Sequence, residues 1–485
     1  MPLLNSMKIL LPRNAVLAAS LFAGMCLLGS WSAVAQTYRE VYSFSVPMGF
    51  PPTNADGAVP YSTVILSGNV LYGTTYQGGS NGAGGVFSVH IDGTHFTNLH
   101  SFGALSGIVY GFNSDGAQPY APLVLSSNVL YGTASGGGAS GYGTIFRMNT
   151  DGTGFTNLHS FTDGLGAPRA GLTLSSNVLY GTTFFGGAGY GSVFRINIDG
   201  RAFTNLHSFT ALSNDADSPE GGLLLISNRL YGTAGGGGNL NGGVVFSVST
   251  VGTGYTNLCN FLLAKGQGQP STNSTGGQPY ATLLLLGNTL YGTTLYGGTN
   301  GNGVVFAVNT DGTGFTNLHT FAAGATGATN SEGASPECQL VFSGGLLYGT
   351  TLSSGVNGFG TIFEMNTNGS GFHVVYPFQP AYNGGFVNQG GANPAAGLLV
   401  AGNTFYGTTT AGGQIAQGNV YALTLSVSLG AQLSPGSLVL SWPNSGLSLQ
   451  ATPALNVAFT NVPGATSPYT NPTTGLQQFF RLVGQ

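Results

Sequence analysis

Residues 123–161 read LVLSSNVLYGTASGGGASGYGTIFRMNTDGTGFTNLHSF and decide the fold. Four short segments rich in β-branched and aromatic residues are separated by turn residues: Leu123–Leu125, Val129–Thr133, Thr144–Met148 and Phe155–Phe161. A Ser127-Asn128 pair, a glycine loop and an Asp151-Gly152 pair divide them. This spacing predicts a four-stranded antiparallel sheet with tight turns at one end.

The same pattern recurs along the chain. The string LYGT or FYGT begins at seven positions, 49 to 60 residues apart: Leu71, Leu130, Leu179, Leu230, Leu290, Leu347 and Phe405. Helical repeats would show a period of 3.6 residues, and leucine-rich repeats would be about half as long. Four strands per unit of this length predict an all-β fold, a seven-bladed β-propeller.

The two ends of the array predict how the ring closes. The last unit supplies three strands only, between Leu398 and Leu425, whereas Tyr38–Phe44 aligns with the fourth strand Phe155–Phe161. The N-terminal segment can therefore supply the fourth strand that the last unit lacks. This pairing would complete the last blade and remove an open sheet edge. We therefore expect a seven-bladed β-propeller closed by the N-terminal strand.

The LYGT motif, its Gly-Gly loop and the Phe-Thr-Asn-Leu-His-Ser-Phe strand resemble the GloVer tandem repeat of secreted bacterial proteins, and more loosely the kelch repeat. The resemblance spans about residues 37–425 and implies a propeller without established catalytic residues. Residues 429–485 resemble the small C-terminal β module of such proteins. Their own pattern predicts β-sandwich-like strands near Leu438–Trp442, Leu447–Leu449, Leu455–Asn461 and Gln477–Val483. The expected domains are a signal peptide (1–35), the propeller (36–428) and this module (429–485).

Residues 1–35 have the pattern of a cleaved secretory signal. Lys8 and Arg13 precede an apolar run, and Ala33-Val34-Ala35 is a small-x-small cleavage site. We expect an exported protein, secreted or at the cell surface, without a transmembrane segment. Cleavage removes Cys26, and the remaining Cys259 and Cys338 belong to different repeats, which argues against a disulfide framework.

The composition excludes two classes of protein. Ten Lys and Arg residues face 14 Asp and Glu residues with no basic run, so the chain lacks the basic surface that nucleic acids require. An apolar content of 42% with 30 Phe and 22 Tyr residues excludes disorder. We expect a monomer that binds no nucleic acid.

Most of the repeated polar residues are predicted to be structural. The tyrosine of each LYGT motif should wedge between blades, and the glycine after it should permit close strand approach. The Asp-Gly pairs at Asp92, Asp151, Asp199 and Asp311 fit hairpin turns. His100, His159, His207 and His319 share a repeat position with Tyr42, Cys259 and Tyr376. A position that accepts Tyr or Cys favours packing over metal binding, and no cofactor is expected.

The variation lies on one face. The loops between the second and third strands, and those from one blade to the next, are long and lie on the same face. A proline precedes each innermost strand, and the residue after it varies: Tyr61, Tyr120, Arg169, Glu220, Tyr280, Glu337 and Ala395. This register predicts a ring at the mouth of the central channel, where all of these except Ala395 are candidate ligand-binding residues.

Three functions stay open from the sequence. The first is a secreted, non-enzymatic scaffold that binds a glycan, peptide or cell-surface ligand through the long-loop face, because aromatic faces with a few polar groups suit such ligands. The second is a glycan hydrolase or lyase with Glu220 and Glu337 as acid and base, although no neighbour in the sequence is seen to tune either pKa. The third is a structural envelope or matrix protein. No catalytic residue is assigned.

Overall fold

The structure is a computed structural model that describes residues 36–49, 51–107, 111–162, 166–210, 212, 214–263, 272–324, 329–379, 388–414, 416–425, 430–434, 437–441, 447–454, 457–465, 469–472 and 478–484. The expected signal peptide, with Cys26, lies outside these residues. The described residues contain no helix long and apolar enough to cross a membrane.

Within the described ranges, seven four-stranded antiparallel sheets resemble propeller blades, and we number them blades 1 to 7. Blades 1 to 3 comprise β2 (Ile65–Ser67), β3 (Val70–Thr75), β4 (Gly85–His90), β5 (Thr97–Ser101); β6 (Val124–Ser126), β7 (Val129–Ala134), β8 (Thr144–Asn149), β9 (Thr156–Ser160); and β10 (Thr173–Ser175), β11 (Val178–Thr183), β12 (Ser192–Asn197), β13 (Thr204–Ser208). Blades 4 to 6 comprise β15 (Leu224–Ile226), β16 (Arg229–Ala234), β18 (Asn241–Ser249), β19 (Thr256–Leu262); β20 (Leu284–Leu286), β21 (Thr289–Thr294), β22 (Val304–Asn309), β23 (Thr316–Thr320); and β24 (Val341–Ser343), β25 (Leu346–Thr351), β26 (Thr361–Asn366), β27 (His373–Pro377). Blade 7 comprises β29 (Leu399–Ala401), β30 (Thr404–Thr409), β32 (Asn419–Leu425) and β1 (Gln36–Ser43).

Most residues of the two central strands of each blade are buried, and most of them are apolar, glycine or threonine. Leu71 and Phe87 of blade 1 are at most 1% exposed, and Tyr72 packs in one cluster with Leu130 and Phe146 of blade 2. The predicted wedge role of the LYGT tyrosine is therefore confirmed at this seam. A Cβ atom on Gly73 would lie 2.6 Å from the Phe87 ring, so the glycine of the motif makes room for that ring.

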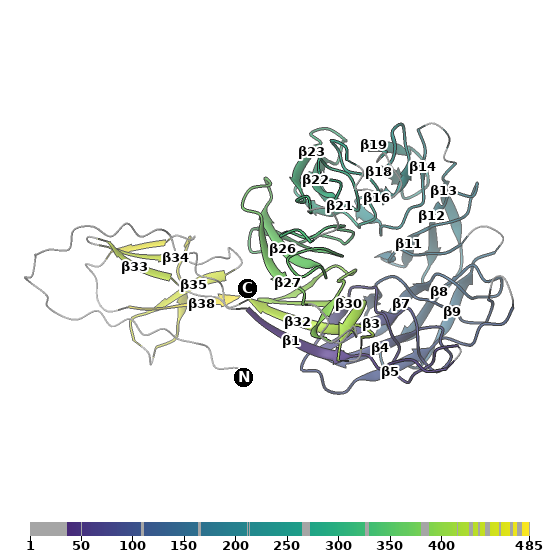
Figure 1. The fold of residues 1–485 in the computed structure, drawn as a ribbon, viewed down its shortest axis with the longest axis horizontal. Helices are drawn as coiled ribbons and strands as arrows, with labels where there is room; N and C mark the ends of the chain where they lie inside the picture. The colour runs from purple at the N-terminus through teal and green to yellow at the C-terminus, as the bar shows by residue number, and fades with distance from the viewer. Residues whose placement is uncertain are drawn as a thin grey trace, which may run out of the picture.

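The N-terminal strand completes blade 7, as predicted. β1 pairs with β32 in antiparallel register from Gln36↔Leu425 to Ser43↔Asn419. Thr408 of blade 7 donates a hydrogen bond to the carbonyl of Ser62, 3.0 Å away, at the start of blade 1. The equivalent bond joins blades 1 and 2 through Thr74 and Ala121 at 3.3 Å. Figure 1 shows the sheets following one another around a ring, with β1 beside β32.

The short turns carry the expected chemistry. The glycines of the four Asp-Gly pairs have φ between 85° and 89°, in the left-handed region. Asp92 accepts hydrogen bonds from the backbone N–H and the hydroxyl of Thr94 at 2.9 and 2.7 Å, and these bonds hold the pKa of its carboxyl below the ordinary value. The aspartates therefore stabilise turns.

Short two-stranded sheets lie in the loops of the long-loop face. β14 (Ala216–Asp217) pairs with β17 (Gly236–Gly237), and β28 (Asn388–Ala392) pairs with β31 (Ala411–Gly413). In both pairs, the loop that enters a blade is joined to the loop between that blade's second and third strands.

The C-terminal segment forms two three-stranded sheets, in the orders β33-β34-β37 and β36-β35-β38. Their strands are β33 (Gly430–Ser434), β34 (Ser437–Ser441), β35 (Leu447–Thr452), β36 (Thr460–Asn461), β37 (Tyr469–Pro472) and β38 (Phe479–Gly484). Leu440 of one sheet and Leu449 of the other share one apolar cluster. Of the expected strand from Leu455 to Asn461, the described residues 457–461 form a strand only at Thr460 and Asn461. β33 and β37 were not predicted. Trp442 and Leu455 lie outside the described residues.

Candidate ligand-binding site

A repeated backbone feature places the residue that follows each proline. The residue before the proline has φ between 55° and 59° in all seven blades, although it is never glycine: Val59, Gln118, Ala167, Ser218, Gln278, Ser335 and Asn393. Its N–H donates to a loop of the preceding blade and its carbonyl accepts from the chain just after the second strand, as in Gln118 with Ala83 at 2.8 Å and Ser135 at 3.1 Å. These bonds offset the strain of a non-glycine residue in this region, about 1–3 kcal/mol.

The proline itself contacts a glycine of the preceding blade. A Cβ atom on Gly84 would lie 2.8 Å from Cδ of Pro119, and one on Gly418 would lie 2.8 Å from Cδ of Pro60. The glycine before the third strand thus lets the next blade approach closely. The entry to every innermost strand is held in the same way, so the residue after the proline varies on a fixed backbone.

The structure brings the predicted ring together. One cavity of about 110 Å³, the channel mouth, is lined by all seven residues that follow the prolines: Tyr61, Tyr120, Arg169, Glu220, Tyr280, Glu337 and Ala395. They come from positions up to 334 residues apart in the chain. The predicted geometry is therefore correct, whereas ligand binding by these side chains stays a prediction.

Aromatic rings cover one side of the channel mouth. Tyr61 and Tyr120 stack with ring centroids 4.8 Å apart and an interplanar angle of 26°. Tyr76, from the loop after β3, meets Tyr61 edge-on at 5.4 Å. Burial raises the pKa of Tyr61 and of Tyr120, so both phenols stay protonated at neutral pH and can donate hydrogen bonds.

The one cation at the channel mouth is already paired. Arg169 Nη1 lies 2.6 Å from Glu220 Oε1, and the Arg169 guanidinium lies 4.0 Å from the centroid of the Phe184 ring. The Glu220 side chain is only 17% exposed. A charge-assisted hydrogen bond at this separation fixes both side chains.

Glu337 has a different environment. Its carboxylate makes no hydrogen bond or ion pair with any other residue in the described ranges, and burial, followed by the charge of Glu220, raises its pKa from 4.5 to about 7. The sequence showed no neighbour that would tune the pKa of either glutamate. The structure corrects this point for Glu337, because burial and the charge of Glu220 raise its pKa.

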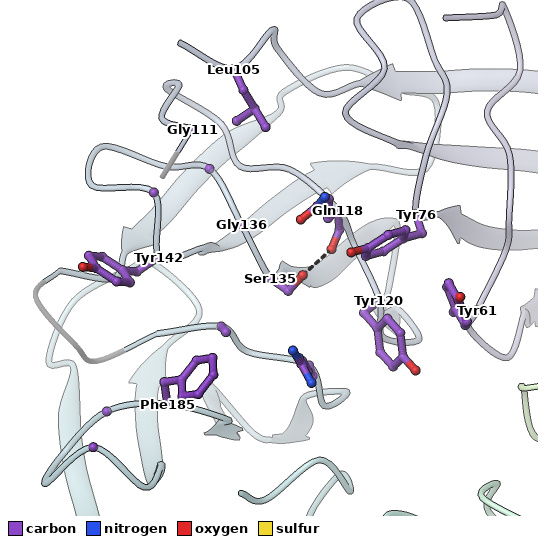
Figure 2. Close-up of a pocket in the computed structure, with 16 residues that line it drawn as sticks. Tyr61, Tyr76, Leu105, Gly111, Gln118, Tyr120, Ser135, Gly136, Tyr142 and Phe185 are labelled. Carbon is purple, nitrogen blue, oxygen red and sulfur yellow. Dashed lines mark hydrogen bonds between the residues drawn. The ribbon is translucent and has the colours of Figure 1, made fainter. Parts of the chain in front are cut away.

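A larger cleft opens beside the channel mouth, on the long-loop face of blades 1 to 3. Its volume is about 830 Å³, and Tyr61, Tyr120 and Arg169 line both spaces. Its other walls come from loops of three blades and include Tyr76, Leu105, Gln118, Ser135, Tyr142 and Phe185. In Figure 2, Tyr61, Tyr76 and Tyr120 lie on one side and Tyr142 and Phe185 on the other. Typical ligand pockets measure about 300–1,000 Å³, so the cleft, unlike the channel mouth, has the usual size.

Apart from Tyr61, Tyr120 and Arg169, the residues of this cleft were not predicted from the sequence, although one signal was present. The residue directly after LYGT and one small residue varies as strongly as the residue after the proline: Tyr76, Ser135, Phe184, Gly235, Leu295, Leu352 and Thr410. Two of these seven residues, Tyr76 and Ser135, line the cleft, and Phe184 supports Arg169. Phe185, which is 50% exposed, follows Phe184.

The shared histidine position is a packing position, as predicted, and in several blades it also bonds to a loop carboxylate, which was not predicted. His100 stacks on Phe155 of the next blade at 3.8 Å, and its Nε2 lies 3.0 Å from Asp115 in the loop that leaves the blade. Tyr42 has the same arrangement with Phe96 at 3.8 Å and Asp56 at 2.9 Å. These contacts, and those of His207 with Asp215 and His319 with Glu332, tie the base of the following loop to the rigid sheet.

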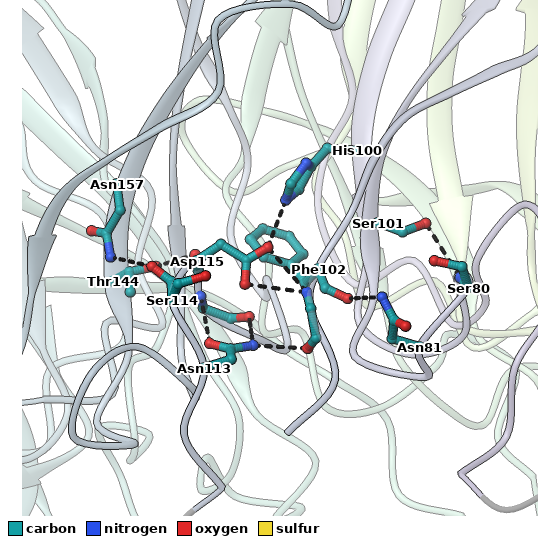
Figure 3. Close-up of polar contacts among 12 residues, drawn as sticks. Ser80, Asn81, His100, Ser101, Phe102, Asn113, Ser114, Asp115, Thr144 and Asn157 are labelled. Atoms are coloured by element: carbon teal, nitrogen blue, oxygen red, sulfur yellow. Dashed lines mark hydrogen bonds and ion pairs between the residues drawn. The ribbon is translucent and has the colours of Figure 1, made fainter. Parts of the chain in front are cut away.

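An asparagine in the same loops adds a second latch that the sequence analysis did not identify. Asn113 donates to the carbonyls of Gly103 and Gly116 at 2.8 and 2.7 Å, and its Oδ1 accepts from Gly116 and Gly138 at 2.8 and 2.9 Å. Figure 3 shows Asn113 beside Asp115, which bonds to His100. Asn54, Asn273 and Asn330 occupy the equivalent place. The recurrent Asn-x-x-Gly spacing is the signal that reveals it.

No group of three His, Cys, Asp or Glu side chains among the described residues lies close enough to hold a metal ion. Cys259 and Cys338 are both free and buried, so the prediction that they form no disulfide with each other is confirmed.

Several solved structures are similar to this chain at low sequence identity. Among solved structures, an oligogalacturonate lyase in complex with manganese is 11% identical, over 77% of this chain and 90% of that chain, with a TM-score of 0.47. A Vibrio parahaemolyticus oligogalacturonate lyase is 8% identical, over 80% and 93%, with a TM-score of 0.46. Acinetobacter baumannii TolB is 11% identical, over 61% and 60%, with a TM-score of 0.36. No curated protein matches the sequence significantly.

A family model gives the sequence relationship. The Gloeobacter/Verrucomicrobia repeat matches residues 30–167 and 268–434, which together are more than half of the chain. The matched segments contain the first two and the last three LYGT-type motifs. The chain therefore belongs to the Gloeobacter/Verrucomicrobia repeat family.

Proposed function

We propose that this chain is an exported, seven-bladed propeller, closed by its N-terminal strand, that binds a ligand through the long-loop face without catalysing a reaction. The C-terminal β module follows the propeller as a separate small domain. The signal-like sequence of residues 1–35 supports export. The 830 Å³ cleft between Tyr76 and Phe185 is the observation that carries the binding function.

The walls of the cleft fit a ligand with flat apolar faces and hydroxyl or amide groups. Tyr61, Tyr76 and Tyr120 form one aromatic cluster, and exposed Phe185 faces the same space. Such rings supply contact area at low entropic cost, and Gln118 adds an amide that can fix orientation. A glycan or a peptide at the cell surface has this chemistry.

The rigid frame supports the same conclusion. The histidine, asparagine and pre-proline contacts fix the bases of the long loops, while the side chains at their tips vary. Binding residues are commonly placed on variable loops of a rigid scaffold. A structural envelope protein would need no pocket of ligand size, so this alternative explains less of the molecule.

A glycan and peptide screen on the mature protein tests the proposal. We expect a ligand whose affinity falls at least tenfold in Phe185→Ala, since central aromatic contacts often contribute more than 1 kcal/mol to binding. Phe342→Ala is the matched control, because Phe342 is 43% exposed against 50% for Phe185 and does not line the cleft. Equal losses in both variants, or no ligand in the screen, would remove the support for this site.

A hydrolase is the second candidate, because one observation favours it. Glu337, with a pKa raised to about 7, and Glu220, which pairs with Arg169, line the same cavity, and glycosidases use two carboxyl groups in different environments as acid and base. The 110 Å³ volume of the channel mouth counts against a sugar ring there. Release of reducing ends from a polysaccharide by the parent but not by Glu337→Gln would establish catalysis.

A further inference from the structure

The charges at the channel mouth do not balance. Arg169 is the only cation among the residues that line it, and Glu220 already pairs with this guanidinium at 2.6 Å. Glu337 is left without a partner in the described part of the chain. Glu337 is only partly exposed and its carboxylate faces the cavity lined by the second glutamate, so the mouth is complementary to a positive charge supplied from outside.

The other walls of the channel mouth also suit a cation. Tyr61, Tyr120 and Tyr280 line the cavity around the two glutamates, and the faces of aromatic rings attract ammonium groups. Burial, followed by the charge of Glu220, raises the pKa of Tyr280, so this ring stays a neutral phenol. The described residues contain no group of three potential metal ligands, which disfavours a metal ion as the cation.

The size of the cavity narrows the choice further. A volume of about 110 Å³ lies well below the 300–1,000 Å³ of a usual ligand pocket. It has room for a small head group on a chain, but not for a whole ring system. The adjoining 830 Å³ cleft shares Tyr61 and Tyr120 with the mouth and can hold the rest of such a molecule.

We propose that the channel mouth binds a primary ammonium group on an unbranched aliphatic chain, with Glu337 as its ion-pair partner and Tyr61, Tyr120 and Tyr280 around it. A lysine side chain of a peptide and a free alkyl diamine share this chemistry. The inference rests on the proposed binding function and names the chemical group at the end of the ligand that enters the channel mouth.

Calorimetric titration of the full-length mature protein at pH 8 tests the proposal. The probes are Nα-acetyl-lysine methylamide, 1,5-diaminopentane and the neutral Nα-acetyl-norleucine methylamide. We expect the lysine derivative to bind at least tenfold more tightly than the norleucine derivative. Stronger binding of the lysine derivative than of the diamine indicates a peptide ligand, and the reverse indicates a free amine. Equal binding of the lysine and norleucine derivatives would overturn the proposal.

Variants assign the effect to Glu337. Glu337→Gln should weaken binding of the lysine derivative at least tenfold, whereas Glu364→Gln, a half-buried carboxyl of the same blade outside the cavity, should leave it unchanged. Tyr280→Ala is a second test, because blade 7 accepts Ala395 at the same position. Unchanged affinity in both channel-mouth variants would refute the assignment.

The pH dependence gives an independent readout. The groups that line the cavity with Glu337 are Glu220, Arg169, Tyr61, Tyr120 and Tyr280, and Arg169 is paired with Glu220. With a pKa of about 7, Glu337 loses its charge on acidification, so affinity should fall about thirtyfold from pH 8 to pH 5.5 in the parent and little in Glu337→Gln. A cleft ligand that Phe185→Ala weakens, together with no ammonium effect, would leave the proposed function standing and reject this inference alone.

Discussion

Replacing Phe44 by alanine tests whether the N-terminal strand is part of the ring. Phe44 is fully buried, its N–H donates to Gly418 of blade 7 at 3.2 Å, and its ring meets Phe87 of blade 1 edge-on at 5.2 Å. Phe161 has the same role inside the array, with its N–H 3.0 Å from the carbonyl of Gly143 and its ring 5.6 Å from Phe194. Phe161→Ala is therefore a matched control.

Both substitutions should cost about 3–5 kcal/mol, the usual loss for a buried Phe→Ala change. Unfolding of roughly 390 residues at about 2.1 cal/mol/K per residue converts 4 kcal/mol into a decrease of about 5 °C in Tm. Far-UV circular dichroism at one scan rate, on the mature parent and both variants, measures this decrease. If the N-terminal strand is only loosely attached, Phe44→Ala will melt within about 1 °C of the parent while Phe161→Ala melts lower, and the closure would be refuted.

Three further predictions concern the frame and the buried groups. In a urea titration, Gly84→Ala should lower the free energy of unfolding by more than about 3 kcal/mol, because its Cβ would lie 2.3 Å from the carbonyl oxygen of Thr75 at φ +88°. Gly68→Ala, at φ +61° with open space around the Cβ, is the control and should lower it by about 1–2 kcal/mol. Burial raises the pKa of Cys259 and of Cys338 to about 12, so neither thiol should react with iodoacetamide at pH 8 until denaturant is added, and labelling of the native protein would contradict the described packing. The folded-state pKa of Glu337 lies above its ordinary 4.5, so its contribution to stability is largest below pH 4.5 and is lost as the pH rises through about 7. The free energy of unfolding of Glu337→Gln should therefore equal that of the parent near pH 4 and exceed it above pH 7 by up to roughly 3 kcal/mol. A constant difference across this pH range would contradict the environment of Glu337.

The repeat made most of the frame predictable. Seven LYGT-type motifs fix the number of blades, and the orphan strand Tyr38–Phe44 shows how the ends meet, because a missing strand and a surplus strand are both visible in the sequence. The register of the residues after the prolines followed from the same argument. The strained residue before each proline was not predictable, since a pre-proline Val59 or Gln118 ordinarily avoids the left-handed region.

The details of the site were less predictable. Pairing of Arg169 with Glu220 depends on how two neighbouring blades orient long side chains, and the raised pKa of Glu337 depends on burial, which a sequence does not show. The cleft is built by loops of three blades, and the repeat alignment alone does not show which tips meet. The C-terminal module was predicted least well, because its short strands occur only once and cannot be compared between repeats.

The most direct test of the account is a crystal structure of the mature protein with the strongest ligand from the screen. The account predicts electron density for the ligand in the cleft between Tyr76 and Phe185, with any ammonium group directed to Glu337. Density on the opposite face, among the turns at Asp92 and Asp151, or only on the C-terminal module, would contradict the assignment of function to the long-loop face.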